Sequence, residues 1–162
     1  MRGGVIACGI PTSLPVVVLK FGSSVLSPPD GYRRAAEEVA REVAKGGRVV
    51  AVVSAMGSTT DRLLETARSL APTPPAALLG QLLATGEDAS VALLSIALTR
   101  EGVNVVSLPT EQFRLQTYGA LGDADPVEAD TSTLTAALGT HDAVVLPGFV
   151  GRDPSGAPSL LG

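Results

Sequence analysis

Four apolar runs separated by polar segments predict the strands of a sheet. They cover residues 15–19, 48–54, 103–108 and 143–146, and valine is their main component. Continuous β-branched runs are typical of strands that are buried on both faces, as in a parallel sheet. We therefore expect a mostly parallel sheet with helices on its faces.

Apolar residues recur at helical spacing between these runs. The spacing predicts a helix that Asp30 caps at its amino end and that ends at Gly46 and Gly47. The β-α-β unit of residues 16–54 favours parallel pairing with a right-handed crossover. Residues 113–118 are expected to form an outer strand or a hairpin arm. Further helices are expected at residues 61–70, 76–84, 89–99 and 130–138, with an interruption at 85–88 and a loop at 122–126.

Composition narrows the class of protein. The chain has 162 residues, enough for one domain, and only 3% aromatic residues, so its core must be aliphatic. The net charge of −4 argues against a nucleic-acid partner. The single cysteine, Cys8, excludes an internal disulfide and suits the reducing cytoplasm. No apolar run approaches the roughly 20 residues of a membrane span. We expect residues 1–14 to be a disordered leader and residues 15–162 to form the domain.

Candidate chemistry gathers where the predicted strands end. Lys20 ends the first apolar run, and residues 22–24 follow it with a glycine and two serines. This combination suits phosphate oxygens, although a solvated lysine beside a polar turn gives the same pattern. The loops at residues 54–61 and 147–151 leave two further strands. Ligands bind at the carboxyl ends of parallel strands, so all three loops are expected to face one crevice.

Several of these residues also have a purely structural interpretation. Thr59 or Thr60 would cap the helix that follows the second strand. Glu87 and Asp88 stand alone as acids in an apolar stretch, either facing solvent at a helix start or binding a cation. His141 precedes a strand, on the side away from the expected crevice, and is interpreted as structural.

Most common catalytic motifs are absent from the sequence. One histidine and one cysteine cannot build a zinc site, and no Walker A or dinucleotide-binding glycine motif is found. Small-residue loops around one lysine suit phosphoryl transfer, in which the protein mainly positions groups and stabilises charge. A carboxylate acceptor is already ionised near pH 7, with a pKa of about 4, so no general base is needed.

Four segments resemble the aspartokinases of the amino acid kinase family, in the family's order and at about its spacing. The first is also similar to the opening motif of glutamate 5-kinases and is one residue shorter than the usual aspartokinase version. The resemblance covers roughly residues 16–162. The segments are LKFGSSV (19–25), VSAMGSTTDRLL (53–64), GE (86–87) and LPGFVGRD (146–153).

This resemblance implies a three-layer α/β/α sandwich and the reaction of ATP, with Mg²⁺, and L-aspartate to give 4-phospho-L-aspartate and ADP. That reaction is the first step of lysine, threonine and methionine biosynthesis. Lys20 would be catalytic and stabilise the transferring phosphoryl group. The phosphate site would contain Lys20, Gly22, Ser23 and Ser24. The amino acid would be bound by Ser54, Thr60 and Glu87, the last of which would hold its ammonium group, and by Gly148 and Phe149.

The sequence departs from the family pattern at its end. In the family, the fourth motif leads into Leu-Gly-Arg-Gly-Gly-Ser-Asp, whereas this chain reaches Leu161-Gly162 and stops. We therefore expect the amino-terminal half of a kinase domain, inactive alone, with self-association or a complementing segment. Two alternatives stay open, a glutamate-specific kinase and a half-domain that binds an amino acid or a partner without turnover.

Overall fold

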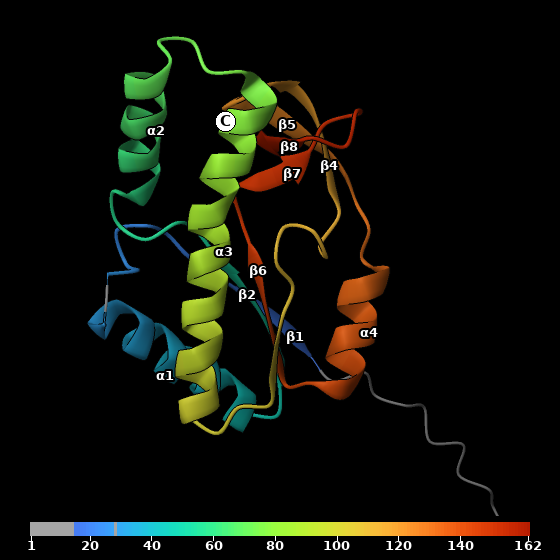
Figure 1. The fold of residues 1–162 in the computed structure, drawn as a ribbon. Helices are drawn as coiled ribbons and strands as arrows, with labels where there is room; N and C mark the ends of the chain where they lie inside the picture. Colours follow the sequence, from blue (N-terminus) through green and yellow to red (C-terminus); the bar gives the residue numbers. More distant parts are fainter. Residues whose placement is uncertain (1–14, 28) are drawn as a thin grey trace, which may run out of the picture.

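The computed structural model describes residues 15–27 and 29–162 (Figure 1). The predicted leader, residues 1–14, lies outside the described residues. In chain order the elements are β1 (Val16–Phe21), α1 (Asp30–Ala44), β2 (Arg48–Val53), α2 (Thr59–Leu70), α3 (Ala76–Arg100), β3 (Val105–Ser107), β4 (Leu115–Ala120), β5 (Asp123–Ala129), α4 (Ser132–Thr140), β6 (Ala143–Pro147), β7 (Val150–Arg152) and β8 (Pro158–Leu160).

The predicted strands form one sheet, here called sheet A, in the order β1-β2-β6-β3. All of its pairs are parallel, with Val18 opposite Val50 and Val50 opposite Val144. Because parallel strands end on the same side, the loops after β1, β2, β3 and β6 lie at one edge of the sheet. The parallel β-α-β unit predicted from the first apolar runs is confirmed.

Helices cover both faces of sheet A. On one face, α1 and α3 pack over a core that includes Val39, Leu94 and Val145. On the other face, α4 packs over a smaller core that includes Val50 and Val144. The helix α1 fits this position because its apolar residues return every three or four residues and form one buried stripe. The three-layer α/β/α fold with a parallel sheet is confirmed.

The first strand differs from the prediction that it is buried on both faces. It is the edge of sheet A, and its side chains alternate between partly buried and exposed positions. Val16 and Val18 are 53% and 64% exposed. The valines of β1 are therefore covered on one face of the sheet only. On the other face, α4 packs against β6 and leaves β1 exposed.

The predicted interruption at residues 85–88 does not exist. The helix α3 runs unbroken through these residues. Gly86 does not break the helix; its missing side chain allows α3 to lie close to Ala55 and Thr59. Joining the two apolar segments also makes α3 long and apolar enough, by length and composition, to cross a membrane, contrary to expectation. Its contacts with α1, α2 and sheet A are those of a core helix.

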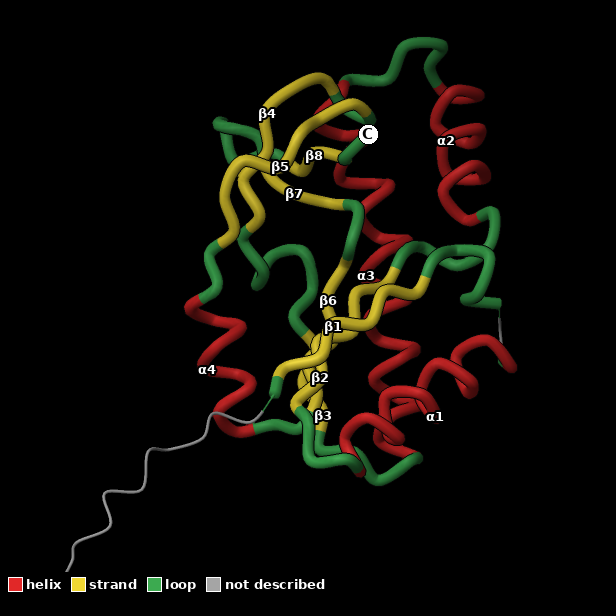
Figure 2. The backbone as a smooth tube through the Cα atoms, turned by 180° about the vertical axis from the view of Figure 1, so that it is seen from behind, coloured by secondary structure: helices red, strands yellow, loops and turns green. Residues whose placement is uncertain are grey.

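A second sheet, sheet B, lies beyond the carboxyl ends of sheet A (Figure 2). Its order is β5-β4-β7-β8, and residues 122–126, expected as a loop, are mostly strand β5. The outer arm predicted at residues 113–118 is confirmed as β4, paired with β5 in a hairpin. A core that includes Leu83, Val150 and Leu160 joins sheet B to α3.

Two predicted helix caps are wrong. Asp30 is the first residue of α1 and pairs with Arg33, while Pro29 is the flanking residue. Thr59 and Thr60 lie in the first turn of α2 rather than at its cap. The third strand is also shorter than predicted, covering Val105–Ser107.

Candidate functional site

The loops that follow β1 and β2 are joined by backbone hydrogen bonds. The N–H of Ser54 donates to the carbonyl oxygen of Phe21 at 3.1 Å, and the N–H of Gly57 donates to that of Ser23 at 3.2 Å. Ser23, Ser24 and Ser54, expected from the sequence to lie near one another, therefore belong to two loops that are in contact. The expectation of a shared edge holds for these loops.

Glu87 joins the loop after β2 to the loop after β6. Its Oε1 accepts a hydrogen bond from the N–H of Ala55 at 2.6 Å. Its Oε2 accepts from the N–H groups of Phe149 at 3.3 Å and of Gly148 at 3.2 Å, the latter shared with the carbonyl oxygen of Val53 at 2.9 Å. The side chain is only 3% exposed, so the interpretation of Glu87 as a solvent-facing acid is wrong.

Three donors among residues 15–27 and 29–162 occupy the carboxylate of Glu87, which leaves one of its acceptor positions unused by them. A carboxylate offers about four acceptor positions, and three are occupied by backbone N–H groups, two of them on Oε2. Burial raises the pKa of Glu87, while the hydrogen bonds from Ala55, Gly148 and Phe149 lower it and leave a net increase. The three hydrogen bonds thus replace only part of the hydration that the carboxylate loses on burial, and a cation beside Oε1 would stabilise its ionised form further.

Lys20 lies at the carboxyl end of β1 with an exposed side chain. It is paired in register with Val52 of β2, and both face the side of sheet A on which α4 packs. Among residues 15–27 and 29–162, no acid forms an ion pair with Lys20. Its ammonium group is thus available to an anion at this edge.

Gly148 packs closely against the same valine. A Cβ at this position would lie 2.6 Å from Cγ1 of Val52, so a larger residue would displace the strand or the loop. Across the sheet, Val52 stands between Lys20 and the loop of Gly148. The missing side chain lets the loop after β6 pack directly against the valine that is the register partner of Lys20.

Residues 22–24 fit a phosphate group. A Cβ at Gly22 would meet no atom within 4 Å, and Ser23 and Ser24 are exposed. The carbonyl oxygen of Gly22 accepts bonds from the N–H groups of Val25 and Leu26, which closes the loop into a turn. These residues follow Lys20 closely in the chain. The lysine ammonium group, the two serine hydroxyl groups and the accessible backbone at Gly22 therefore lie on one short segment.

The structure places the remaining predicted residues on α2 and in the segment after β6. Thr60 lies in the first turn of α2, where the helix dipole favours a negative charge. Phe149 is partly buried in the core beneath sheet B, together with Leu83. A cavity of about 870 Å³ lies elsewhere, between β4 and the β7–β8 turn, and none of the predicted site residues lines it.

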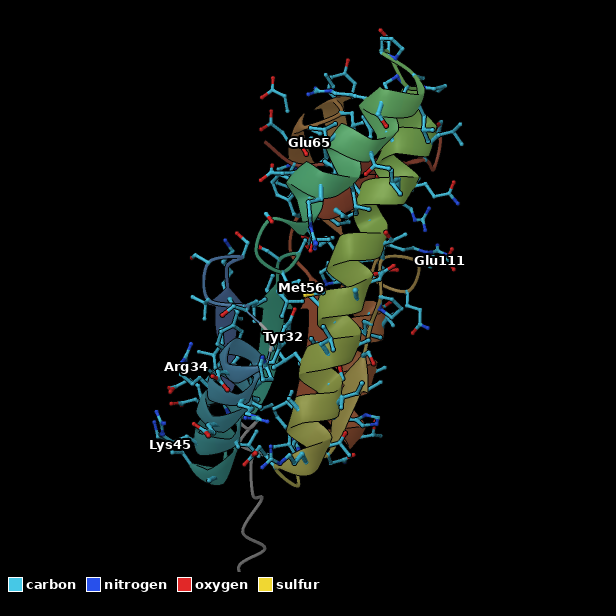
Figure 3. All side chains as sticks on the ribbon, turned by 60° about the vertical axis from the view of Figure 1, so that its left-hand side comes forward. Tyr32, Arg34, Lys45, Met56, Glu65 and Glu111 are labelled. Carbon is cyan, nitrogen blue, oxygen red and sulfur yellow. The ribbon has the colours of Figure 1, made fainter. Side chains whose placement is uncertain are left out.

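Two polar contacts near Glu87 were not predicted. The hydroxyl groups of Tyr32 and Ser90 lie 2.8 Å apart and are buried between α1 and α3 (Figure 3). Burial raises the pKa of Tyr32, the bond to Ser90 lowers it, and the charge of Glu87 raises it further. Asp88 accepts two bonds from Thr110. A possible signal was the spacing of Glu87 and Ser90, which puts both on one face of a helix.

Comparison with known proteins decides the family. A family model described as "Amino acid kinase family" matches residues 15–162. The chain belongs to the amino acid kinase family. The aspartokinase of Thermus thermophilus is 36% identical over 149 residues, which are 92% of this chain and 37% of that protein. The resemblance to aspartokinases seen in the sequence is confirmed.

Solved structures agree with this family. The aspartate kinase from Synechocystis superposes with a TM-score of 0.71 at 28% identity, over 91% of this chain and 24% of that one. The E. coli aspartokinase III crystallised with aspartate and ADP has the same fold, with a TM-score of 0.67 at 21% identity. The chain spans about a third of the length of the curated relatives that it matches.

The members of this family are kinases, so the fit of ATP and Mg²⁺ can be tested against the residues described. The segment from Lys20 to Ser24 suits phosphate oxygens. Across residues 15–27 and 29–162, no group of three or more His, Cys, Asp or Glu side chains could hold a metal ion. The segment from Lys20 to Ser24 therefore fits the phosphate part of such a ligand, and Mg²⁺, which commonly takes one or two carboxylates together with phosphate oxygens, would not need a cluster of three protein ligands.

Proposed function

We propose that this chain carries the amino-acid side of an aspartokinase active site. The reaction is the transfer of the terminal phosphoryl group of ATP to the side-chain carboxylate of L-aspartate, which gives 4-phospho-L-aspartate and ADP. Support comes from the family match and from aspartokinase relatives at 36% identity. Residues 15–162 would form the domain that contributes this side, in the cytoplasm, and self-association or a complementing segment would complete it.

The observation that carries the proposal is the environment of Glu87. A buried carboxylate with one acceptor position left on Oε1, held between the loops after β2 and β6, is suited to a ligand's ammonium group. Thr60 and the amino end of α2 would bind the α-carboxylate. The side-chain carboxylate would then extend toward Gly148 and Lys20.

Lys20 and residues 22–24 would act on the phosphate side. The lysine ammonium would stabilise negative charge on the phosphoryl group during transfer, and the two serines and the backbone at Gly22 would orient its oxygens. The acceptor carboxylate attacks in its ionised form, so no side chain needs to remove a proton. ATP supplies the phosphoryl group when bound.

Binding of L-aspartate, measured by isothermal titration calorimetry, tests this proposal without requiring turnover. Glu87→Gln should weaken binding roughly tenfold or more, since it removes the charge that pairs with the ammonium group. The matched control is Glu65→Gln, an exposed acid on α2 that Figure 3 shows away from Met56 and the loop after β2.

Phosphoryl transfer is tested by trapping the acyl phosphate with hydroxylamine in the presence of ATP. Lys20→Ala should abolish any hydroxamate formed. The control is Lys45→Ala, which removes an exposed lysine paired with Glu42 at the end of α1 (Figure 3). Tighter binding or faster hydroxamate formation with L-glutamate would assign the chain to glutamate instead, and retained binding without any hydroxamate would favour a non-catalytic role.

A further inference from the structure

Two short segments lead directly from sheet A into sheet B. Residues 108–114 connect β3 to β4, and residues 148–149 connect β6 to β7. The strands they lead into, β4 and β7, are neighbours in sheet B, with Gln116 opposite Arg152. The position of sheet B over the strand ends of sheet A therefore depends on how these two segments are held, in addition to the core that joins β7 and β8 to α3.

Adjacent acids of α3 hold the two segments. Glu87 accepts the N–H groups of Gly148 and Phe149, which are the whole of the second segment. Asp88 accepts with one oxygen, Oδ1, both the N–H of Thr110 at 2.9 Å and its hydroxyl at 2.8 Å. Thr110 is in the first segment and is 4% exposed.

The segment that Asp88 holds is itself a fixed turn. The carbonyl oxygen of Pro109 accepts the N–H groups of Gln112 at 2.8 Å and Phe113 at 3.1 Å. Leu108, on the other side of Thr110, is buried in the core beneath α4. A displacement at Thr110 is thus transmitted to the start of β4 rather than absorbed in a flexible loop.

We propose that Asp88 is a positioning residue of the amino-acid site, which with Glu87 fixes both segments leading into sheet B and couples the placement of that sheet to occupancy of Glu87. The coupling to an amino acid rests on the proposed function. Thermodynamic linkage makes it reciprocal: if loss of Asp88 weakens binding at Glu87, binding at Glu87 stabilises the contact between Asp88 and Thr110.

Amide hydrogen exchange, followed by NMR, tests the positioning role without any ligand. In Asp88→Ala the amide of Thr110 loses its acceptor, and exchange should accelerate roughly tenfold or more. The decisive readout is at Gly148 and Phe149, whose N–H groups donate to Glu87 rather than to Asp88 and should also exchange faster. Phe149 is the more sensitive probe, because Gly148 also donates to the carbonyl oxygen of Val53. Acceleration at Thr110 alone would overturn the proposal.

Asp153→Ala provides a matched control. Asp153 accepts the N–H and hydroxyl of Ser155 in the β7–β8 turn, the same chemistry as Asp88 with Thr110, but away from the two connecting segments. Asp153→Ala should leave exchange at Thr110, Gly148 and Phe149 unchanged. Asp88→Asn keeps an oxygen that accepts both bonds and should restore the original exchange pattern.

The affinity for L-aspartate tests the coupling. Asp88→Ala should raise Kd about fivefold or more, while Asp88→Asn and Asp153→Ala stay within about twofold. Equal losses in Asp88→Ala and Asp153→Ala would overturn the coupling. Absence of aspartate binding by the unmodified chain would contradict the proposed function, whereas the exchange pattern would still confirm or overturn the positioning role.

Variants of the partner residue decide the matter if Asp88→Ala does not fold by circular dichroism. Thr110→Val removes the hydroxyl bond and keeps the N–H bond, and Thr110→Ser keeps both donors. Faster exchange at Gly148 and Phe149 in Thr110→Val, with normal exchange in Thr110→Ser, supports the proposal. Unchanged exchange in both variants overturns it.

Discussion

Sheet A and sheet B are held in place by different means. Every residue of β6 in sheet A is buried, and the flanking helices form continuous cores on its two faces. In sheet B, most residues of β4 and β5 are exposed, and the register shifts between Gln116 and Thr117. Burial of aliphatic side chains accounts for sheet A but cannot account for the hairpin of sheet B.

Specific contacts at the base of sheet B add to the small core under β7 and β8. Gly80 of α3 and Gly151 of β7 allow backbones to approach where a side chain would overlap Pro158 or Thr117. Glu87 and Asp88 hold the segments leading into β7 and β4. The difference teaches that the candidate site lies at the junction between sheet A, which two large cores stabilise, and sheet B, which has a small core under β7 and β8 and a mostly exposed hairpin.

The largest expected effect comes from matched valine substitutions in the two sheets. Val145 of β6 is fully buried, and Val145→Ala should lower the free energy of unfolding by about 2–3 kcal/mol, through lost burial and a cavity. Val127 of β5 is 66% exposed, and Val127→Ala should change it by less than about 0.5 kcal/mol. Urea denaturation measures both, and similar losses would contradict the contrast between the sheets.

Two helical glycines test the close approach of α3 to sheet B. A Cβ at Gly80 would overlap the carbonyl oxygen of Pro158 in β8, so Gly80→Ala should destabilise the protein by about 1–3 kcal/mol. Gly139 of α4 has no atom within 4 Å of its Cβ position, and Gly139→Ala should stabilise it by about 0.5–1 kcal/mol. Thermal melting of the two variants should therefore shift in opposite directions.

The raised pKa of Glu87 gives two opposite pH trends. Between the ordinary value of 4.5 and its raised value, the folded chain binds more protons than the unfolded chain, so the contribution of Glu87 to stability falls as pH rises. Affinity for an ammonium ligand should rise over the same range, because the ligand needs the ionised carboxylate. Unfolding and aspartate titration between pH 4 and pH 8, with Glu87→Gln as control, measure both trends, and parallel trends would contradict this account.

The smallest effect is expected on the open face of β1. Val18 is largely exposed, and Val18→Thr should change the free energy of unfolding by less than about 0.5 kcal/mol. The same change reduces apolar surface on an edge strand and should reduce self-association. Sedimentation velocity at two concentrations measures this, and a large loss of stability would show that the face is buried.

Sheet A could be predicted from the sequence, whereas of sheet B only the arm at residues 113–118 was predicted. Runs such as residues 48–54 mark buried strands by composition alone, and β2 confirmed this one. The strand β5 contains two aspartates, a proline and a glutamate, which are residue types that disfavour strands. Its backbone pairing with β4 stabilises it as a strand nevertheless. The break predicted at Gly86 was wrong for a similar reason. The role of this glycine is a close contact with Ala55, which is far away in the sequence and leaves no local signal.

The candidate site was predicted in part. Lys20 and the serines stood out because they follow apolar runs, and Glu87 because it interrupts one, but a binding role for Glu87 was implied only by the resemblance to aspartokinases. The bonds of Glu87 to Ala55, Gly148 and Phe149 could not be predicted, since backbone N–H groups leave no signal in the sequence. The contact of Asp88 with Thr110 depends equally on the fold, which brings the loop after β3 against α3. The roles of the site residues in binding stay predictions.

The central claim is that the carboxylate of Glu87 binds the ammonium group of L-aspartate. A titration of isotope-labelled protein with L-aspartate, followed by amide NMR spectra, tests it most directly. We predict the largest shifts at the amides of Ala55, Gly148 and Phe149, and their loss in Glu87→Gln. Shifts confined to the cavity beside Arg114 and Arg152, or shifts that persist in Glu87→Gln, would contradict it.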